Sequence, residues 1–131
     1  MDVEWGGIYM YDPPSSTNSP QMAAIVQSGS EQSGWRPFVI VSRDGANRNR
    51  PTAVGVPLST NVSKANSYRI LIPVEDIIPA GFSSYQFQNS VALCDHVRVL
   101  DLNMLRSKVG SLSGTAIAAI GNGLANLFDL R

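Results

Sequence analysis

Short apolar runs separated by polar turns dominate the first hundred residues of the chain, and this pattern predicts β-strands. The clearest run, Pro37–Phe38–Val39–Ile40–Val41, contains no polar side chain, which is typical of a strand buried on both faces. Asp44–Gly45 then opens a polar, arginine-bearing segment up to Arg50–Pro51, where we expect a loop. The other runs predict strands over Gly7–Tyr11, Thr52–Leu58, Tyr68–Ile72, Ser90–Cys94 and Val97–Leu100.

The C-terminal segment changes to a helical period. Its large apolar residues are spaced so that they share one helix face: Ile117, Ile120, Leu124, Leu127 and Phe128. Ser113 or Thr115 can cap this helix by accepting a hydrogen bond from a free backbone amide. Gly121 and Gly123 lie inside it and each costs about 0.5–1 kcal/mol relative to alanine, so tertiary packing must hold the helix. Many short strands followed by one helix predict a compact, barrel-like α+β fold.

A segment of unusual composition follows the first predicted strand. Residues 13–19 contain only Pro, Ser, Thr and Asn, whereas Met22–Val26 supplies a short apolar centre, typical of about one helical turn. We therefore expect a long inserted loop at about 13–29. Its apolar second half is predicted to rest on the barrel near Glu31 and Arg36, where it would shape substrate choice. The alternative is a surface insertion without a role.

Length and composition restrict the class of protein. The 131 residues predict a single domain, 1–131. The longest aliphatic or aromatic runs, such as Phe38–Val41, are far shorter than the roughly 20 residues of a membrane helix, and the acidic start lacks the basic residues of a secretory signal. One cysteine, Cys94, and one histidine, His96, exclude an internal disulfide framework and a His-rich or multi-cysteine metal site. We expect a cytoplasmic protein without a metal or other cofactor.

The net charge is zero, but the charges are unevenly distributed. Residues 1–35 contain four acids and no base, and residues 36–69 contain six bases, five of them arginine, against Asp44 alone. Arginine suits bidentate contact with phosphate, so the middle of the chain is a candidate surface for a polyanion. A solvated face that the acidic start neutralises in three dimensions explains the charges equally well.

Two groups of polar residues lie where predicted strands begin or end. Glu31, Gln32 and Arg36 precede the buried run, so a strand anchors the Arg36 side chain at its base. Ser59–Thr60–Asn61 follows the strand predicted from Thr52. Both groups are candidates for chemistry. The alternatives are an Arg36–Glu31 ion pair that caps the barrel and hydroxyl and amide groups that only cap a turn.

Cys94–Asp95–His96 is a third candidate. Cys94 ends an apolar run, which favours a small core residue over a nucleophile. Asp95 and His96 are either an acid–base pair or simple turn residues. Because neighbours in a strand point to opposite faces, they can share a site only where the backbone kinks.

Four motifs, in this order, resemble the MazF/PemK toxin family: Gly6–Tyr9, Ser30–Pro37, Val56–Thr60 and Ser90–Asp95. The resemblance covers the chain from about Gly6 to Leu130, with one long insertion. It implies an α+β fold with a compact SH3-like β-barrel of the CcdB/MazF type and a C-terminal α-helix. It also implies a homodimeric toxin of a toxin–antitoxin system that cuts single-stranded RNA, mRNA in particular, without a metal. The acidic tail of a cognate antitoxin is then expected to occupy the RNA groove.

The resemblance also implies roles for individual residues. Arg36 matches the family's catalytic arginine, and Ser59 stands where most members have a catalytic threonine. Glu31 matches a glutamate that is important in some members. Asp95 matches an aspartate proposed as the general base in PemK/Kid-type members, but Leu93 replaces the arginine of that type and Ser30 replaces its histidine. The arrangement centred on Arg36 and Ser59 is therefore preferred, and the residues expected to contact the substrate are Gln32, Thr60, Asn61, Arg48 and Asp95.

A toxin of a different class is the alternative. CcdB-like toxins share the implied fold but bind and poison DNA gyrase without nuclease activity. They resemble one another in a C-terminal Trp–Gly–Ile tail, whereas this chain ends Phe128–Asp129–Leu130–Arg131. A third possibility, a barrel that only binds RNA, requires the catalytic positions to be inert.

Overall fold

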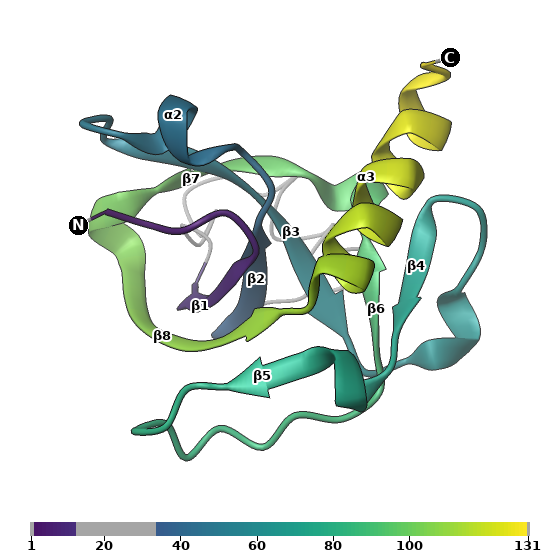
Figure 1. The fold of residues 1–131 in the computed structure, drawn as a ribbon, viewed down its shortest axis with the longest axis horizontal. Helices are drawn as coiled ribbons and strands as arrows, with labels where there is room; N and C mark the ends of the chain where they lie inside the picture. The colour runs from purple at the N-terminus through teal and green to yellow at the C-terminus, as the bar shows by residue number, and fades with distance from the viewer. Residues whose placement is uncertain (1, 13–33, 131) are drawn as a thin grey trace, which may run out of the picture.

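The computed structural model describes residues 2–12 and 34–130, which form a curled antiparallel sheet of eight strands with a C-terminal helix (Figure 1). The expected inserted loop at about 13–29 and the candidates Glu31 and Gln32 lie outside these residues. Within the described ranges, no helix combines the length and hydropathy that a membrane span requires. The curled sheet and the helix confirm the predicted α+β class.

The elements follow one another along the chain with short connections. The strands are β1 Gly7–Tyr11, β2 Arg36–Ile40, β3 Thr52–Ser59, β4 Arg69–Ile72, β5 Ile77–Pro79, β6 Ser90–Leu93, β7 Arg98–Asp101 and β8 Leu105–Leu112. The α-helices of the described residues are α2, Asp44–Asn47, and α3, Gly114–Phe128. Single 3-10 turns cover Val62–Lys64, Val74–Asp76, Cys94–His96 and Leu102–Met104.

Strand β3 joins the two parts of the sheet. The strand order is β4-β6-β3-β2-β1-β8-β5, and β7 also pairs with β3. The first half of β3 pairs with β7, and its end at Leu58 and Ser59 pairs with β6. β8 pairs with both β1 and β5, and its register against β1 shifts twice, which bends the strand around the barrel.

Two apolar clusters fill the two faces of this sheet. One cluster lies between the sheet and α3 and includes Ile8, Val39, Val56 and Ile120. The other lies on the opposite face, inside the curl of β1, β2, β3, β7 and β8, and includes the edge-to-face pair of Tyr11 and Phe38. Alternate residues of β2 point into different clusters, which explains why the whole run after Arg36 is apolar.

Helix α3 packs closely on β4 and on the turn after β6. Ser113 caps it by accepting a hydrogen bond from the amide of Ala116 at 3.2 Å, as the sequence predicted. The buried positions of the helix are Ala116, Ile120 and Gly123. A Cβ atom at Gly123 would lie 2.6 Å from Cγ1 of Ile70 and 3.0 Å from Sγ of Cys94, so only glycine permits this approach. Phe128, the last of the five large apolar residues on the predicted helix face, is 58% exposed, because the helix extends beyond the sheet at its end (Figure 1).

The six predicted strands are present, each within one residue of its expected ends. Two strands escaped prediction. β5 has only three residues, and β8 interrupts its apolar positions with Arg106, Ser107 and Lys108 and shifts register, so it lacks a regular alternation. The loop expected between Asp44 and Pro51 contains the short helix α2.

The packing of α3 predicts opposite effects for its two inner glycines. In Gly123→Ala, overpacking against Ile70 should destabilise the protein by about 1–3 kcal/mol. The higher helix propensity of alanine should offset about 1 kcal/mol of this loss. Gly121→Ala is the matched control, because a Cβ there meets nothing within 4 Å and should stabilise the helix by up to about 1 kcal/mol. Thermal unfolding of both variants measures this. Equal shifts of the two midpoints would contradict the close approach at Gly123.

Candidate active site

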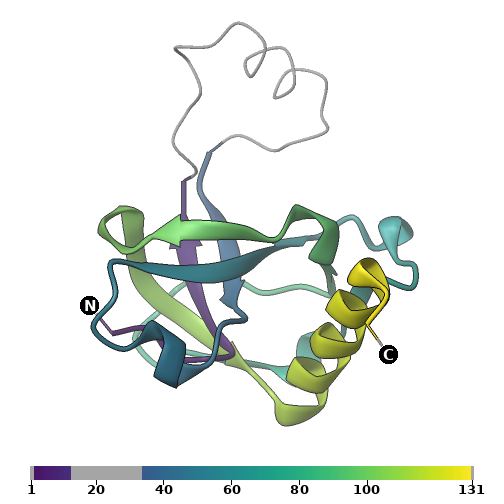
Figure 2. The same cartoon turned by 90° about the horizontal axis from the view of Figure 1, so that it is seen from above.

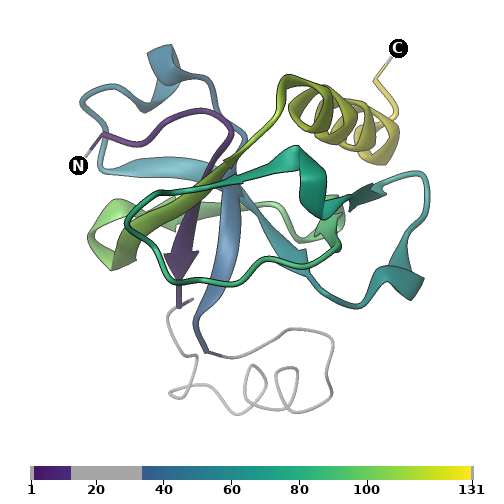
Figure 3. The same ribbon diagram turned by 60° about the horizontal axis from the view of Figure 1, so that its bottom comes forward.

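Arg36 is the first residue of β2 and lies where β1 ends. Figure 3 shows these two strand ends side by side. Tyr11, the last residue of β1, is paired with Arg36. The β2–β3 register runs from Ile40 opposite Gly55 to Phe38 opposite Pro57, and continuing it by two residues sets Arg36 opposite Ser59. Directly opposite residues in antiparallel strands project from the same face. Arg36 and Ser59 therefore lie on neighbouring strands and face the same way.

The Arg36 guanidinium is partly buried and has no counter-ion in the described part of the chain. The ion pairs found there involve Arg69, His96 and Lys108. Burial lowers the pKa of Arg36 below its usual value, and nearby Tyr85 offsets part of this effect. Arginine stays protonated at any physiological pH, so a partly desolvated positive charge remains that favours binding an anion.

The Ser59 hydroxyl is buried at the end of β3, with a relative exposure of 3%. Its Oγ accepts a hydrogen bond from the amide of Asn61 at 3.2 Å. The described residues accept no hydrogen bond from this hydroxyl, so its proton can be donated to an oxygen of a bound group. Thr60 and Asn61 are exposed beside it, and Oδ1 of Asn61 accepts a hydrogen bond from Ser63 at 2.6 Å.

Asp95 belongs to a separate polar cluster. Arg69 binds its carboxylate bidentately, with Nε 3.0 Å from Oδ1 and Nη2 2.6 Å from Oδ2. The 3-10 turn Cys94–His96 provides the backbone kink that the sequence required, and Nε2 of His96 lies 3.9 Å from Oδ2 of Asp95. Val91 is opposite Ser59, whereas Asp95 lies beyond the end of β6, where its carboxylate is paired with Arg69.

The charge state of Asp95 follows from this pairing. Burial alone would raise the pKa of the Asp95 carboxyl, but the hydrogen bonds and charge of Arg69, with a contribution from His96, outweigh burial and hold the pKa below its usual value. A carboxylate stabilised in its ionised form is a weak proton acceptor. Neighbouring Cys94 is fully buried, and burial raises the pKa of its thiol to about 11, as expected for a core residue.

Comparison with known proteins shows the family to which the chain belongs. Residues 21–128 match the family described as "PemK-like, MazF-like toxin of type II toxin-antitoxin system". The chain belongs to this toxin family. It is 33% identical over 97 residues to "Endoribonuclease MazF" of Staphylococcus saprophyticus, a match that covers 73% of this chain and 75% of the relative. The enzyme of the same name from Staphylococcus epidermidis is 32% identical over the same length.

Solved structures share the fold of this toxin at low sequence identity. MazF of Deinococcus radiodurans is similar with a TM-score of 0.68 at 18% identity, and the match covers 99% of both chains. A mycobacterial endoribonuclease in complex with its cognate antitoxin matches with a TM-score of 0.61 at 19% identity, over 99% of this chain and 96% of that one. These likenesses confirm the predicted MazF-type fold, a curled antiparallel sheet with a C-terminal helix.

The structure of the toxin places Arg48 away from Arg36. Arg48 follows α2, at the end of the barrel opposite to Tyr11 and Arg36 (Figure 2). There it lines a surface pocket together with Asp2, Glu4 and Asp44. Its surroundings are therefore acidic, in contrast to those of Arg36.

Two residues near the candidate groups escaped the sequence analysis. Tyr85 lies close enough to Arg36 for each to influence the other's pKa, and it packs edge-to-face on Phe87. No sequence signal identifies it, because it lies in an irregular segment far along the chain. Arg69 could have been identified, since antiparallel pairing of the strands predicted at Tyr68 and Ser90 brings it close to Asp95.

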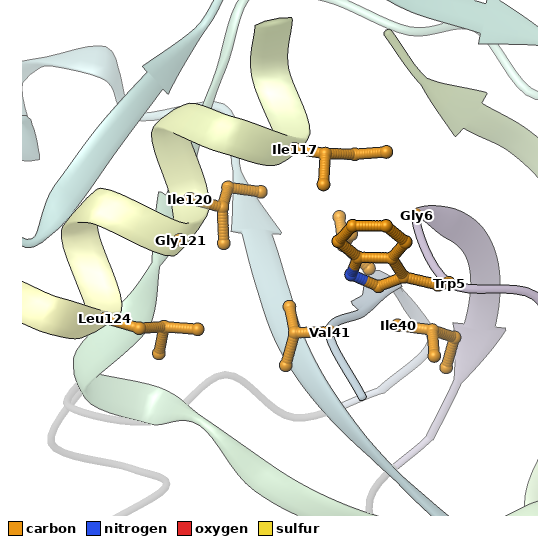
Figure 4. Close-up of a pocket in the computed structure, with 9 residues that line it drawn as sticks. Trp5, Gly6, Ile40, Val41, Ile117, Ile120, Gly121 and Leu124 are labelled. Carbon is orange, nitrogen blue, oxygen red and sulfur yellow. The ribbon is translucent and has the colours of Figure 1, made fainter. Parts of the chain in front are cut away.

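An apolar pocket of about 130 Å³ lies on the other side of the sheet, beside α3 (Figure 4). Trp5 stands over it, and Val41, Ile117 and Leu124 are among the side chains that line it. None of its lining side chains is ionisable, so the pocket offers no acid, base or phosphate ligand. Among residues 2–12 and 34–130, no group of three or more His, Cys, Asp and Glu side chains is arranged to hold a metal ion.

Proposed function

We propose that the toxin is an endoribonuclease that cuts single-stranded RNA, mRNA in particular, at specific sequences. The observation that carries this proposal is the partly buried Arg36 guanidinium, which has no counter-ion in the described chain and lies on the strand next to the Ser59 hydroxyl. Such a pair of donors suits a phosphodiester. The family and the endoribonuclease relatives at about one-third identity support the choice of RNA.

The proposed reaction uses the nucleophile that RNA itself supplies. The 2′-oxygen forms a bond to the adjacent phosphorus, the bond from phosphorus to the 5′-oxygen breaks, and the products carry a 2′,3′-cyclic phosphate and a 5′-hydroxyl. A base takes the proton of the 2′-hydroxyl, and the leaving oxygen gains a proton. Arg36 stabilises the extra negative charge on the phosphoryl oxygens, and Ser59 donates a hydrogen bond to the phosphate or the 2′-hydroxyl. No step of this scheme requires a metal.

The remaining candidates have supporting roles in this proposal. Glu31 is the candidate for the general base, because the pKa of Asp95 is held low by Arg69. Thr60 and Asn61 are exposed beside Ser59 and suit contacts to the substrate, together with Gln32. Asp95 would contact the RNA rather than move a proton. Arg48 would contact only a part of the RNA distant from the cut.

Two partners complete the proposal, a second copy of the chain and an antitoxin. The toxin would act in the cytoplasm as a homodimer whose RNA groove the antitoxin's acidic tail occupies. Structures titled as MazE–MazF complexes of Deinococcus radiodurans, with TM-scores of 0.62 and 0.65, support binding of an antitoxin. The exposed apolar side chains of Phe128 and Leu130 support a subunit interface at the end of α3.

Metal-independent cleavage and its dependence on Arg36 are the first test. Purified toxin in excess EDTA should cut a long RNA of mixed sequence. Arg36→Ala should lower the rate at least about 100-fold, because a donor to the charge that develops on phosphorus is lost. Arg50→Ala is the matched control, since Arg50 is exposed near α2, and it should cut at the wild-type rate. Gel analysis of end-labelled RNA measures the rates.

Two results would contradict the assignment. Undiminished cleavage by a folded Arg36→Ala protein would remove Arg36 from the chemistry. Intact RNA, together with inhibition of DNA gyrase in a parallel assay, would favour the CcdB-like alternative.

The assembly is tested by light scattering and competition. The toxin should have a mass of about 28 kDa in solution, twice the 14.1 kDa of the chain, at the concentration at which it cuts RNA. An acidic antitoxin peptide should displace RNA from it. A mass of about 14 kDa during active cleavage contradicts the dimer, and simultaneous binding of peptide and RNA contradicts the shared groove.

A further inference from the structure

Trp35 and Arg106 meet beside the end of β1, at the same end of the sheet as Arg36. Tyr11, the last residue of β1, is paired with Arg36 on one side and with Leu105 on the other. Trp35 precedes Arg36 and Arg106 follows Leu105, so the two side chains approach each other where β1 ends. The central carbon of the Arg106 guanidinium lies 4.9 Å from the centroid of the Trp35 ring.

The exposure of this pair is unusual for a purely structural contact. Trp35 is 47% exposed, although burial is the normal way for an indole to stabilise a fold. Arg106 is exposed and forms no ion pair with a carboxylate of the described residues. A guanidinium over one face of an indole restrains the ring and leaves the other face for a second flat group. The pair therefore has the form of an aromatic platform with a free positive charge at its side.

We propose that Trp35 and Arg106 form a stacking platform for one base of the RNA, at the same end of the sheet as Arg36. A nucleobase has the flat face that stacks on an indole, and its own phosphate supplies the negative charge that attracts Arg106. Trp35 directly precedes Arg36 in the chain, so the stacked base would belong to a nucleotide close to the cut. This inference rests on the proposed function and adds a positioning contact to it.

The second tryptophan of the chain is a matched control. Trp5 is 52% exposed, close to the value for Trp35, but it stands over the apolar pocket beside α3, which no charged side chain lines. Both indoles therefore report on ligands that reach the protein surface. Trp35, in contrast, has the Arg106 guanidinium over its ring.

Two single-tryptophan proteins test the platform by fluorescence. Trp5→Phe retains Trp35, and Trp35→Phe retains Trp5. Each is titrated with single-stranded 2′-O-methyl RNA of mixed sequence, which cannot undergo attack by its 2′-oxygen, and with an abasic oligonucleotide of the same length and charge. The base-bearing oligonucleotide should quench Trp35, the abasic one should not, and neither should quench Trp5.

Cleavage kinetics provide the second readout. Trp35→Ala should raise KM about tenfold with a smaller change in kcat, and Trp35→Phe should restore most of the loss because it retains a ring for stacking. A purely structural contact between Trp35 and Arg106 would lower the unfolding midpoint without base-dependent quenching, which would overturn the platform.

The outcomes separate the platform from the proposed function. Bound oligonucleotide without quenching of Trp35, or an unchanged KM for Trp35→Ala, overturns the platform while RNA cleavage stands. Equal quenching by the abasic oligonucleotide also overturns it, because phosphate alone then accounts for the signal. Failure of the wild-type protein to bind or cut any RNA overturns the proposed function and the platform together.

Discussion

The Arg36 guanidinium is partly buried, and the described residues offer it no carboxylate. The rest of the candidate site is arranged around this constraint. A charge removed from water needs a partner, and because the described residues supply none, the site favours an anion from outside them. Strand pairing holds this charge in place, because β1 pairs with β2 at Tyr11 and Arg36, and the β2–β3 register, continued by two residues, sets Ser59 opposite Arg36. The backbone ladder, rather than a flexible loop, therefore aims the guanidinium.

The sheet separates this chemistry from the packing of helix α3. On the α3 side, Ile70 and Cys94 touch the helix at Gly123, and the larger apolar cluster lies there. Because residues alternate along a strand, the neighbours of Ile70 face away from the helix, and Arg69 reaches Asp95 on that other side. Substitutions of polar residues on the face turned away from α3 can thus alter which substrate is bound without disturbing the helix interface.

Sequence patterns predicted the elements with a regular period, and they failed where the decisive contact was long-range. The apolar runs gave six strands because burial on one or both faces leaves a local pattern, whereas β8 lost that pattern to Arg106, Lys108 and two register shifts. The spacing of large apolar residues in α3 placed Phe128 and Ile120 on one face, but only Ile120 is buried. The other buried positions are the small residues Ala116 and Gly123, because the helix lies close to the sheet. For the site, motif resemblance assigned Arg36 and Ser59 their roles. It could not identify Tyr85, Arg69 or the Trp35–Arg106 contact, which exist only after strands distant in sequence are paired.

The central claim is that the protein holds the Arg36 charge for its substrate and not for its own stability. The free energy of unfolding of Arg36→Met, measured beside single-turnover RNA cleavage, tests this claim most directly. Replacing a partly buried charge that has no counter-ion among the described residues by an apolar side chain of similar length should leave the free energy of unfolding equal to or above that of the wild type, while cleavage is lost. A loss of stability of more than about 1 kcal/mol, or cleavage that survives the substitution, would contradict the account.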